Sequence, residues 1–356
     1  MHVKVDRENR FISMFNPDTG FYVRTSVRED RKDTGIDPFM ANYPELLDIG
    51  ISGKCEAGKL GLCKASGIEC YQSGATISKP HMTLDNFKRI IDESKGKVFQ
   101  VALGGRGDPD QHPDFEAILR YCRENNIVPN FTTSGIKMTP EKAKLCKTFC
   151  GACAVSEQRA FHTKAALGVF LKAEVKTNLH YVLGNNTINE AINRLNDDSF
   201  ARGINAVIFL LHKPVGLGSK NNVLKVGDPR LEKFFTLITE KHPYKIGFDS
   251  CSASGIINYS KGVNPNSMDT CEGARFSAYI SSEMIMSPCS FDREEKWGFD
   301  LNQGTIQDAW NSPQFEDFRN HLKDACPNCK DREACMGGCP IKNEIVLCNR
   351  TERSLK

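Results

Sequence analysis

Between residues 46 and 211, short apolar runs alternate with longer segments of helical periodicity. The six runs are LLDIGI (46–51), VFQVALGG (98–105), VPNFTTSG (128–135), ACAVS (152–156), TNLHYVL (177–183) and AVIFLL (206–211). They are rich in Val, Ile, Leu and Phe without strict alternation, which is typical of strands covered on both faces. Six strand–helix units in series predict parallel strands joined by right-handed crossovers, and hence an α/β fold with a partial (β/α)6 TIM-like barrel. A flat, doubly wound sheet is the competing architecture.

Recognisable capping residues mark where the helical segments begin. Thr83 precedes LDNFKRIIDES, and Asp228 is followed by a proline, which is favoured at the first position of a helix. Thr187 and Glu190 have the spacing of a capping box, in which each side chain binds the other residue's free amide. We therefore expect helices to begin at these three points.

The pattern of apolar runs changes at both ends of the chain. The first 45 residues are polar and rich in turn residues, and they give no clear assignment. Beyond residue 250 the apolar runs give way to eight cysteines. We therefore expect an N-terminal extension (1–45), a barrel (46–250) and a small cysteine-rich domain (251–356).

Composition bounds the class of protein. The net charge of +3 on 356 residues is too small to indicate a nucleic-acid partner or a membrane surface. No run of about 18 apolar residues is present, and the N-terminus lacks the apolar core of a signal peptide. These features predict a cytoplasmic protein. Because the cytosol keeps thiols reduced, metal ligation explains most of the 15 cysteines better than disulfides do, and several others are expected to be plain core residues.

Four of these cysteines lie in the stretch CPNCKDREACMGGCP, residues 326–340. A structural zinc site commonly uses two CxxC pairs, whereas this stretch has only one. Its end, C-x3-C-P, is instead the spacing of bacterial ferredoxins. The stretch therefore favours iron–sulfur ligation, and a zinc-stabilised binding module is the alternative.

The C-terminal cysteines resemble the seven-cysteine signature of the SPASM domain, over about residues 251–350. That domain follows a radical S-adenosylmethionine (SAM) barrel and carries auxiliary [4Fe–4S] clusters. The resemblance implies an outer cluster bound by Cys326, Cys329, Cys335 and Cys348. It also implies an inner cluster bound by Cys271, Cys289 and Cys339, with Cys251 as the candidate for the fourth ligand. One departure is Met284, which stands where a glycine is often found.

Three further cysteines follow the first apolar run, at the end of the barrel where reactive residues are expected. They are Cys55, Cys63 and Cys70. Three cysteines in one loop can hold three irons of a [4Fe–4S] cube and leave the fourth iron open. The loop resembles the radical SAM core, whose open iron takes the amino and carboxylate groups of SAM. Most members of that family space their cysteines x3 and x2, whereas the gaps here are x7 and x6.

The second run ends in a glycine-rich stretch. Gly104 and Gly105 resemble the family's Gly-Gly-Glu-Pro stretch, which holds the methionine amino group of SAM, because glycine lets the backbone approach closely. The family glutamate is absent: Arg106 takes its place, and we expect Asp108 to make the amino contact instead. The resemblance also gives two candidates for the ribose or carboxylate contact, Ser156 and Ser134.

A second cysteine series, Cys146-x3-Cys150-x2-Cys153, has the usual family spacing. It follows the glycine stretch and spans the end of a helix and the start of the fourth strand. The cluster loop must instead follow the first strand to reach the same rim. We therefore interpret these three cysteines as buried structural residues, because free cysteine is a common core residue.

The resemblance implies an enzyme with SAM and three [4Fe–4S] clusters, one that binds SAM and two auxiliary clusters. It would cleave SAM to a 5′-deoxyadenosyl radical and modify a peptide or protein side chain, for example by a thioether or C–C crosslink. An implied partner is a reductant such as flavodoxin or ferredoxin. Because the N-terminal extension is short for a full leader-peptide-binding domain, leader binding is expected in a separate protein or in this segment used differently. The alternatives are formylglycine generation and a non-radical iron–sulfur electron carrier, which would leave the loop of residues 55–70 unexplained.

Overall fold

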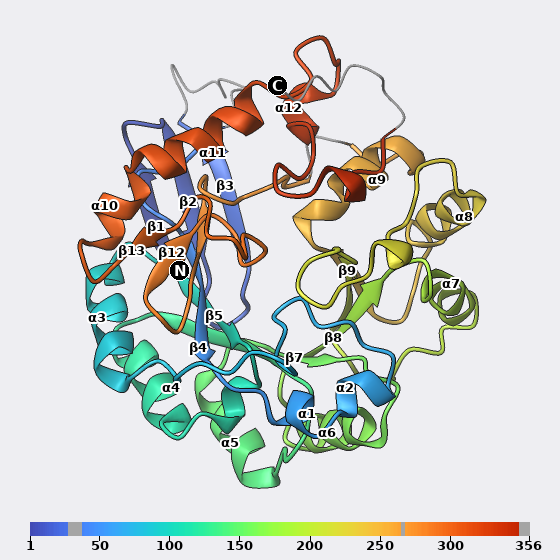
Figure 1. Ribbon diagram of the computed structural model, residues 1–356, viewed down its shortest axis with the longest axis horizontal. Helices are drawn as coiled ribbons and strands as arrows, with labels where there is room; N and C mark the ends of the chain where they lie inside the picture. The colour runs from blue at the N-terminus through green and yellow to red at the C-terminus, as the bar shows by residue number, and fades with distance from the viewer. Residues whose placement is uncertain (28–37, 265–267, 349–356) are drawn as a thin grey trace.

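The computed structural model describes residues 1–27, 38–264 and 268–348. A ten-stranded sheet in the order β10-β9-β8-β7-β6-β5-β4-β11-β12-β13 curves into an open barrel (Figure 1). Its six central strands are parallel and coincide with the six apolar runs: β4 (Leu46–Ser52), β5 (Gln100–Gly105), β6 (Val128–Thr133), β7 (Cys153–Ser156), β8 (Thr177–Leu183) and β9 (Ala206–Leu211). The predicted partial barrel is confirmed.

Six helices form an arc around the outside of this sheet (Figure 1). They are α3 (Leu84–Ser94), α4 (Phe115–Glu124), α5 (Pro140–Phe149), α6 (Phe161–Lys172), α7 (Ile188–Asn196) and α8 (Pro229–Leu237). Outward-facing strand residues such as Leu47, Ile49 and Leu103 are at most 2% exposed beneath them. Burial of each such side chain stabilises the fold by about 1.5–3 kcal/mol. Alternate residues face the barrel interior, which is how the sheet presents polar groups such as Asp48 there.

The expected helix starts are confirmed, and one expected capping interaction is wrong. Thr83 caps α3 by accepting a hydrogen bond from the Asn86 amide at 3.2 Å. Thr187 precedes α7, but its hydroxyl donates to the Val182 carbonyl at 2.8 Å. The Glu190 carboxylate forms ion pairs with the side chains of Arg159 and Arg194 and not with the start of the helix. Both members of the predicted capping box therefore have other partners.

The sheet continues beyond the six central strands on both sides. Strand β10 (Lys245–Phe248) pairs in parallel with β9, and β11 (Ser277–Ile280) pairs in parallel with β4. Two antiparallel strands, β12 (Ile285–Ser287) and β13 (Phe299–Asp300), complete this side. The C-terminal helices are α9 (Ala253–Tyr259), α10 (Ile306–Trp310), α11 (Pro313–Lys323) and α12 (Arg332–Cys335). The cysteine-rich region is thus hydrogen-bonded directly to the barrel.

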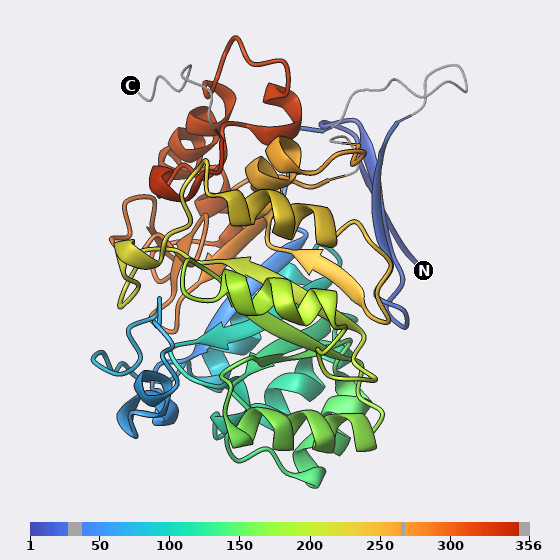
Figure 2. The ribbon, with the colours of Figure 1, turned by 90° about the vertical axis from the view of Figure 1, so that its right-hand side faces the viewer.

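The N-terminal region forms a separate antiparallel sheet of β1 (His2–Asp6), β2 (Phe11–Phe15) and β3 (Tyr22–Ser26). Phe15 stacks on Phe99, just before β5, with ring centroids 5.5 Å apart. Figure 2 shows this sheet at one end of the barrel, and the short helices α1 (Glu56–Lys59) and α2 (Leu62–Ala65) at the opposite end. None of the helices in the described ranges is long and apolar enough to cross a membrane.

Candidate metal centres and cofactor site

The loop after β4 carries the first predicted cysteine group, Cys55, Cys63 and Cys70. Cys55 caps α1, and its Sγ accepts a hydrogen bond from the Gly58 amide at 3.1 Å. Burial, followed by the neighbouring thiols of Cys55 and Cys70, raises the pKa of Cys63 to about 11. The three thiols therefore lie close enough to repel one another as thiolates, which is the arrangement that bound iron would stabilise.

Two neighbouring loops hold this cysteine loop in place. A Cβ atom on Gly107, in the loop after β5, would lie 2.0 Å from the Lys54 carbonyl oxygen and 3.0 Å from Cys55 Cα. The Leu217 amide, in the loop after β9, donates to the Cys70 carbonyl at 3.0 Å. The cysteine loop thus extends across the barrel mouth between β5 and β9, and only glycine fits at position 107.

Gly104 and Gly105 end β5 beside this loop, as the sequence predicted. Gly105 has φ +121°, and a Cβ on it would lie 2.3 Å from the Ser52 carbonyl oxygen. The next residue, Arg106, donates its amide to the same carbonyl at 2.7 Å. Gly104 faces the barrel interior, where its Cβ position is 3.6 Å from Asp48 Oδ1. The glycines therefore bring this backbone close to β4.

Asp108 is the buried acid of this rim. Its carboxylate accepts hydrogen bonds from the Ser134 amide at 2.7 Å and the Ser134 hydroxyl at 2.5 Å. Burial, followed by the nearby Asp110 carboxylate, raises the pKa of Asp108 to about 6. The negative charge of Asp108 also contributes to the raised pKa of the Cys55 and Cys63 thiols. The structure thus brings two predicted SAM contacts, Asp108 and Ser134, together next to the cysteines.

Arg106, at the position of the family glutamate, points away from this group. Its Nη1 lies 4.0 Å from the Glu283 carboxylate in the C-terminal region. Burial, followed by the neighbouring Arg293, lowers the pKa of Arg106. Arg293 in turn donates to Gln72 Oε1 at 2.8 Å. Among the described residues, the buried Arg106 Nε and Gln72 Nε2 have no hydrogen-bond partner.

Beyond β7, the structure adds a residue that sequence reasoning missed. Ser156 ends β7, half-buried, and its carbonyl accepts a hydrogen bond from the Thr163 hydroxyl at 3.2 Å. Gln158, two residues further, is 5% exposed and donates from Nε2 to Cys63 Sγ at 3.9 Å. The other atom of this side-chain amide, Gln158 Oε1, forms a hydrogen bond with His162 Nε2 at 2.9 Å. The only signal for Gln158 in the sequence was its position just after a predicted strand, at the rim of the barrel.

The second cysteine group lies in the C-terminal region. The Cys251 thiol forms a hydrogen bond with the Cys339 thiol. Burial, followed by the charge of Cys251, raises the pKa of Cys271 to about 12, and the same two causes raise the pKa of Cys289. The four predicted inner ligands therefore come together, including the distant candidate Cys251. Four soft thiolates in one buried group are a donor set that suits iron.

The third group surrounds a cavity between α9 and α12. The cavity is lined by all four predicted outer ligands, Cys326, Cys329, Cys335 and Cys348. A tight turn at Gly337 (φ +74°) and Gly338 (φ +83°) follows Cys335. These four thiols also fit a cluster by their chemistry and by their common cavity. The remaining cysteine series, Cys146, Cys150 and Cys153, lies at the other end of the barrel, because Cys153 begins β7.

Comparisons with known proteins find a matching family model and similar curated proteins. The model of the SPASM family, described as an iron–sulfur cluster-binding domain, matches residues 271–336. Mycofactocin maturase MftC from Mycolicibacterium smegmatis is 24% identical over 303 residues, which cover 78% of this chain and 75% of that protein. MftC from Mycobacterium tuberculosis is 25% identical over 315 residues, with the same coverage.

Solved structures share the fold. SuiB from Streptococcus suis, solved with bound S-adenosylmethionine, has a TM-score of 0.66 at 16% identity, over 89% of this chain and 78% of SuiB. Native anSMEcpe with bound AdoMet has a TM-score of 0.59 at 18% identity, over 87% of this chain and 92% of that one. The C-terminal region therefore carries a SPASM iron–sulfur cluster-binding domain, and the chain is similar in sequence to the MftC maturases and in fold to the SAM-bound SuiB and anSMEcpe structures.

Proposed function

We propose that this enzyme reductively cleaves SAM and modifies a side chain of a ribosomally made peptide. The observation that carries the proposal is the three-cysteine group at the barrel rim, one ligand short of a complete set, with two four-cysteine groups in the attached C-terminal region. MftC is a maturase by name, and SuiB has been solved with its precursor peptide SuiA (TM-score 0.63, 15% identity, 92% of this chain and 84% of that one).

The proposed cofactors are SAM and three [4Fe–4S] clusters, held by the three cysteine groups described above. When bound, a reduced cluster held by the rim cysteines would supply the electron for cleavage of SAM to methionine and a 5′-deoxyadenosyl radical. The chain's own residues have other tasks. The ionised Asp108 carboxylate would bind the amino group of SAM, and Ser134 fixes the rotamer of that carboxylate through two hydrogen bonds. Ser156 lies at the same rim for the ribose or carboxylate contact.

The peptide would enter between the rim and the C-terminal region. Gln72 ends the cysteine loop and accepts a hydrogen bond from Arg293 of the C-terminal region, which lies near Arg106 just after β5. Buried donors without partners are costly, by about 1–3 kcal/mol each. The free Nε of Arg106 and the free Nε2 of Gln72 are therefore available to acceptor groups of a bound peptide.

Two partners are proposed besides the peptide. A flavodoxin or ferredoxin would deliver the electron, and the reaction would take place in the cytoplasm. A separate protein would bind the leader peptide, because the described part of the N-terminal region is a three-stranded sheet packed at the end of the barrel away from the cysteine loop (Figure 2).

Formation of 5′-deoxyadenosine tests the proposal. Anaerobically reconstituted protein, reduced with dithionite in the presence of SAM, should produce it. Cys70→Ala should abolish it, whereas Cys122→Ala should not, because Cys122 is buried in α4 away from all three groups. Full activity in the Cys70→Ala variant, or none in wild type containing about twelve irons, contradicts the proposal. Oxidation of a serine to formylglycine also removes two hydrogen atoms, so the total mass alone does not separate it from a crosslink. Fragmentation of the modified peptide, together with an aldehyde-reactive reagent that labels only formylglycine, separates the two products.

A further inference from the structure

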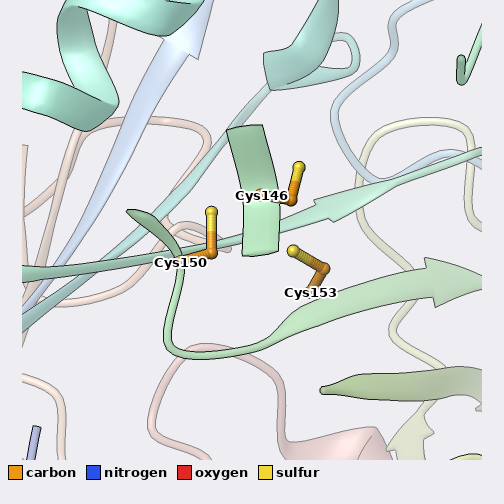
Figure 3. A group of neighbouring side chains, drawn as sticks. All are labelled: Cys146, Cys150 and Cys153. Atoms are coloured by element: carbon orange, nitrogen blue, oxygen red, sulfur yellow. The ribbon is translucent and has the colours of Figure 1, made fainter. Parts of the chain in front are cut away.

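Three thiols outside these sites come together at the far end of the barrel. Cys146 lies in the last turns of α5, Cys150 ends that helix, and Cys153 begins β7. Their Sγ atoms all lie within 4.8 Å of one another (Figure 3). The group is thus built from a helix end, a turn and a strand start, on the side of the barrel opposite the cysteine loop.

The separation of the sulfur atoms indicates how many metal ions the group can hold. Thiolates at 2.3 Å from one tetrahedral zinc ion are about 3.8 Å apart. A [4Fe–4S] cube holds each cysteine on a different iron, so its ligand sulfurs lie farther apart than those around a single ion. In the ranges that the structure describes, no other group of three His, Cys, Asp or Glu ligand atoms is as close as this one. The geometry therefore fits one ion.

The backbone around the group is fixed before any ion binds. The Cys150 amide donates to the Cys146 carbonyl at 2.8 Å and ends α5. Next to it, a Cβ on Gly151 would lie 2.6 Å from Val128 Cγ1, so this turn packs directly on β6. The Gly151 amide also donates to the Pro129 carbonyl at 3.0 Å. The turn that carries Cys150 therefore has little freedom, as a preorganised metal site requires.

Charge and access are also suitable for a cation held by thiolates. Arg123 lies near Cys150 and would offset the negative charge of thiolates, whereas Lys142, near Cys146, is paired with the buried Asp110 carboxylate at 3.0 Å. Cys146 and Cys153 are fully buried, whereas Cys150 is partly exposed. Access for an ion is therefore from the side of Cys150, at the turn between α5 and β7.

We propose that Cys146, Cys150 and Cys153 bind a single thiophilic metal ion, Zn²⁺, that fastens the end of α5 to β6 and β7. Three thiolates around Zn²⁺ leave one net negative charge, whereas Cu⁺ would leave two, which is less favourable at a buried site. Binding releases the three thiol protons to solvent. The fourth zinc position would be open toward the partly exposed side of Cys150.

Metal analysis of the fully iron-loaded enzyme tests the proposal, since the clusters then occupy the other candidate cysteines. We expect one zinc per chain that survives gel filtration with a mild chelator. X-ray absorption at the zinc edge should give about three sulfur neighbours near 2.3 Å. Cys153→Ser and Cys150→Ser should each reduce bound zinc at least tenfold, and the matched control Cys122→Ser should retain it. Cys150→Ser keeps the test valid if Cys153→Ser fails to fold, because Cys150 is the least buried member.

Three results would overturn the proposal: no zinc in the loaded wild type, zinc that the chelator removes equally from wild type and Cys150→Ser, or zinc lost equally in Cys122→Ser. Four additional irons at these cysteines would also contradict it. The test is independent of the proposed function. Formation of 5′-deoxyadenosine should persist in Cys150→Ser, because the cysteine loop lies at the opposite end of the barrel (Figure 2).

Discussion

Replacement of Gly107 by alanine tests whether the glycine-rich loop positions the cysteine loop. The added Cβ would lie 2.0 Å from the Lys54 carbonyl oxygen, and Cβ contacts below 3.0 Å do not occur. The two backbone segments must therefore separate by at least 1.0 Å. Both atoms in conflict belong to backbone or Cβ, so no side chain can rotate to relieve the contact. Cys55 follows Lys54 directly and must move with it.

Two effects of Gly107→Ala follow from this displacement. Overpacking costs about 1–3 kcal/mol of unfolding free energy. A 1 Å misplacement of a reacting group lowers the rate on the order of 10²-fold. We therefore expect a roughly hundredfold loss of 5′-deoxyadenosine formation per bound rim cluster, or a loss of about four of the irons. Activity is measured by chromatography and iron by a colorimetric assay.

Gly168→Ala is the matched control. Gly168 lies inside α6 with nothing within 4 Å of its Cβ position. Alanine there should stabilise the protein by about 0.5–1 kcal/mol and leave activity unchanged. Wild-type iron content together with wild-type activity in Gly107→Ala would refute the reasoning about close approach.

Three further predictions concern the same rim. The raised pKa of Asp108 is about 6, and only the ionised carboxylate binds an ammonium group. SAM affinity should therefore fall up to about tenfold per pH unit below pH 6. The Asp108→Asn variant should bind SAM weakly at every pH, as measured by the spectral change of the cluster when SAM is added. Gln158→Leu removes a hydrogen bond to Cys63 and should lower the reduction potential of the rim cluster by about 20–60 mV in a redox titration. Arg106→Ala should preserve SAM cleavage but raise KM for the peptide severalfold, because this side chain faces Glu283 rather than the cysteines.

Each of these predictions has a contrary result. An unchanged pH profile in Asp108→Asn would show that another group binds the amino end of SAM. A potential that rises in Gln158→Leu would contradict a stabilising hydrogen bond to the reduced cluster. Loss of SAM cleavage in Arg106→Ala, with KM for the peptide unchanged, would place Arg106 at the SAM site instead.

The barrel could be predicted from the sequence because its strands are covered on both faces. Their apolar runs therefore have no polar interruptions, and β4 to β9 fall on them. The N-terminal sheet could not be predicted for the opposite reason. In β2 the buried face carries Phe11, Ser13 and Phe15, and the Ser13 hydroxyl donates to the buried Glu45 carboxylate. A polar residue on the covered face removes the alternation that identifies a strand.

The candidate site was partly predictable for a similar reason. Short cysteine spacings specify a local group, so the loop of residues 326–339 was evident from the sequence. The approach of Cys251 to Cys339 depends on how α9 packs, and no local pattern encodes it. The orientation of Arg106 and the contact of Gln158 with Cys63 are likewise set by tertiary packing.

The parallel pairing of β11 with β4 joins the cysteine loop and the C-terminal cysteine groups through one sheet. One continuous sheet runs from the strand before Cys55 to the strand pair before Cys289. Hydrogen-bonded neighbours in a sheet keep their spacing of about 4.8 Å. The spacing between the cysteine loop and the C-terminal cysteine groups is therefore set when the chain folds. In the proposed reaction, an electron that passes between these groups would cross a distance that the fold itself determines.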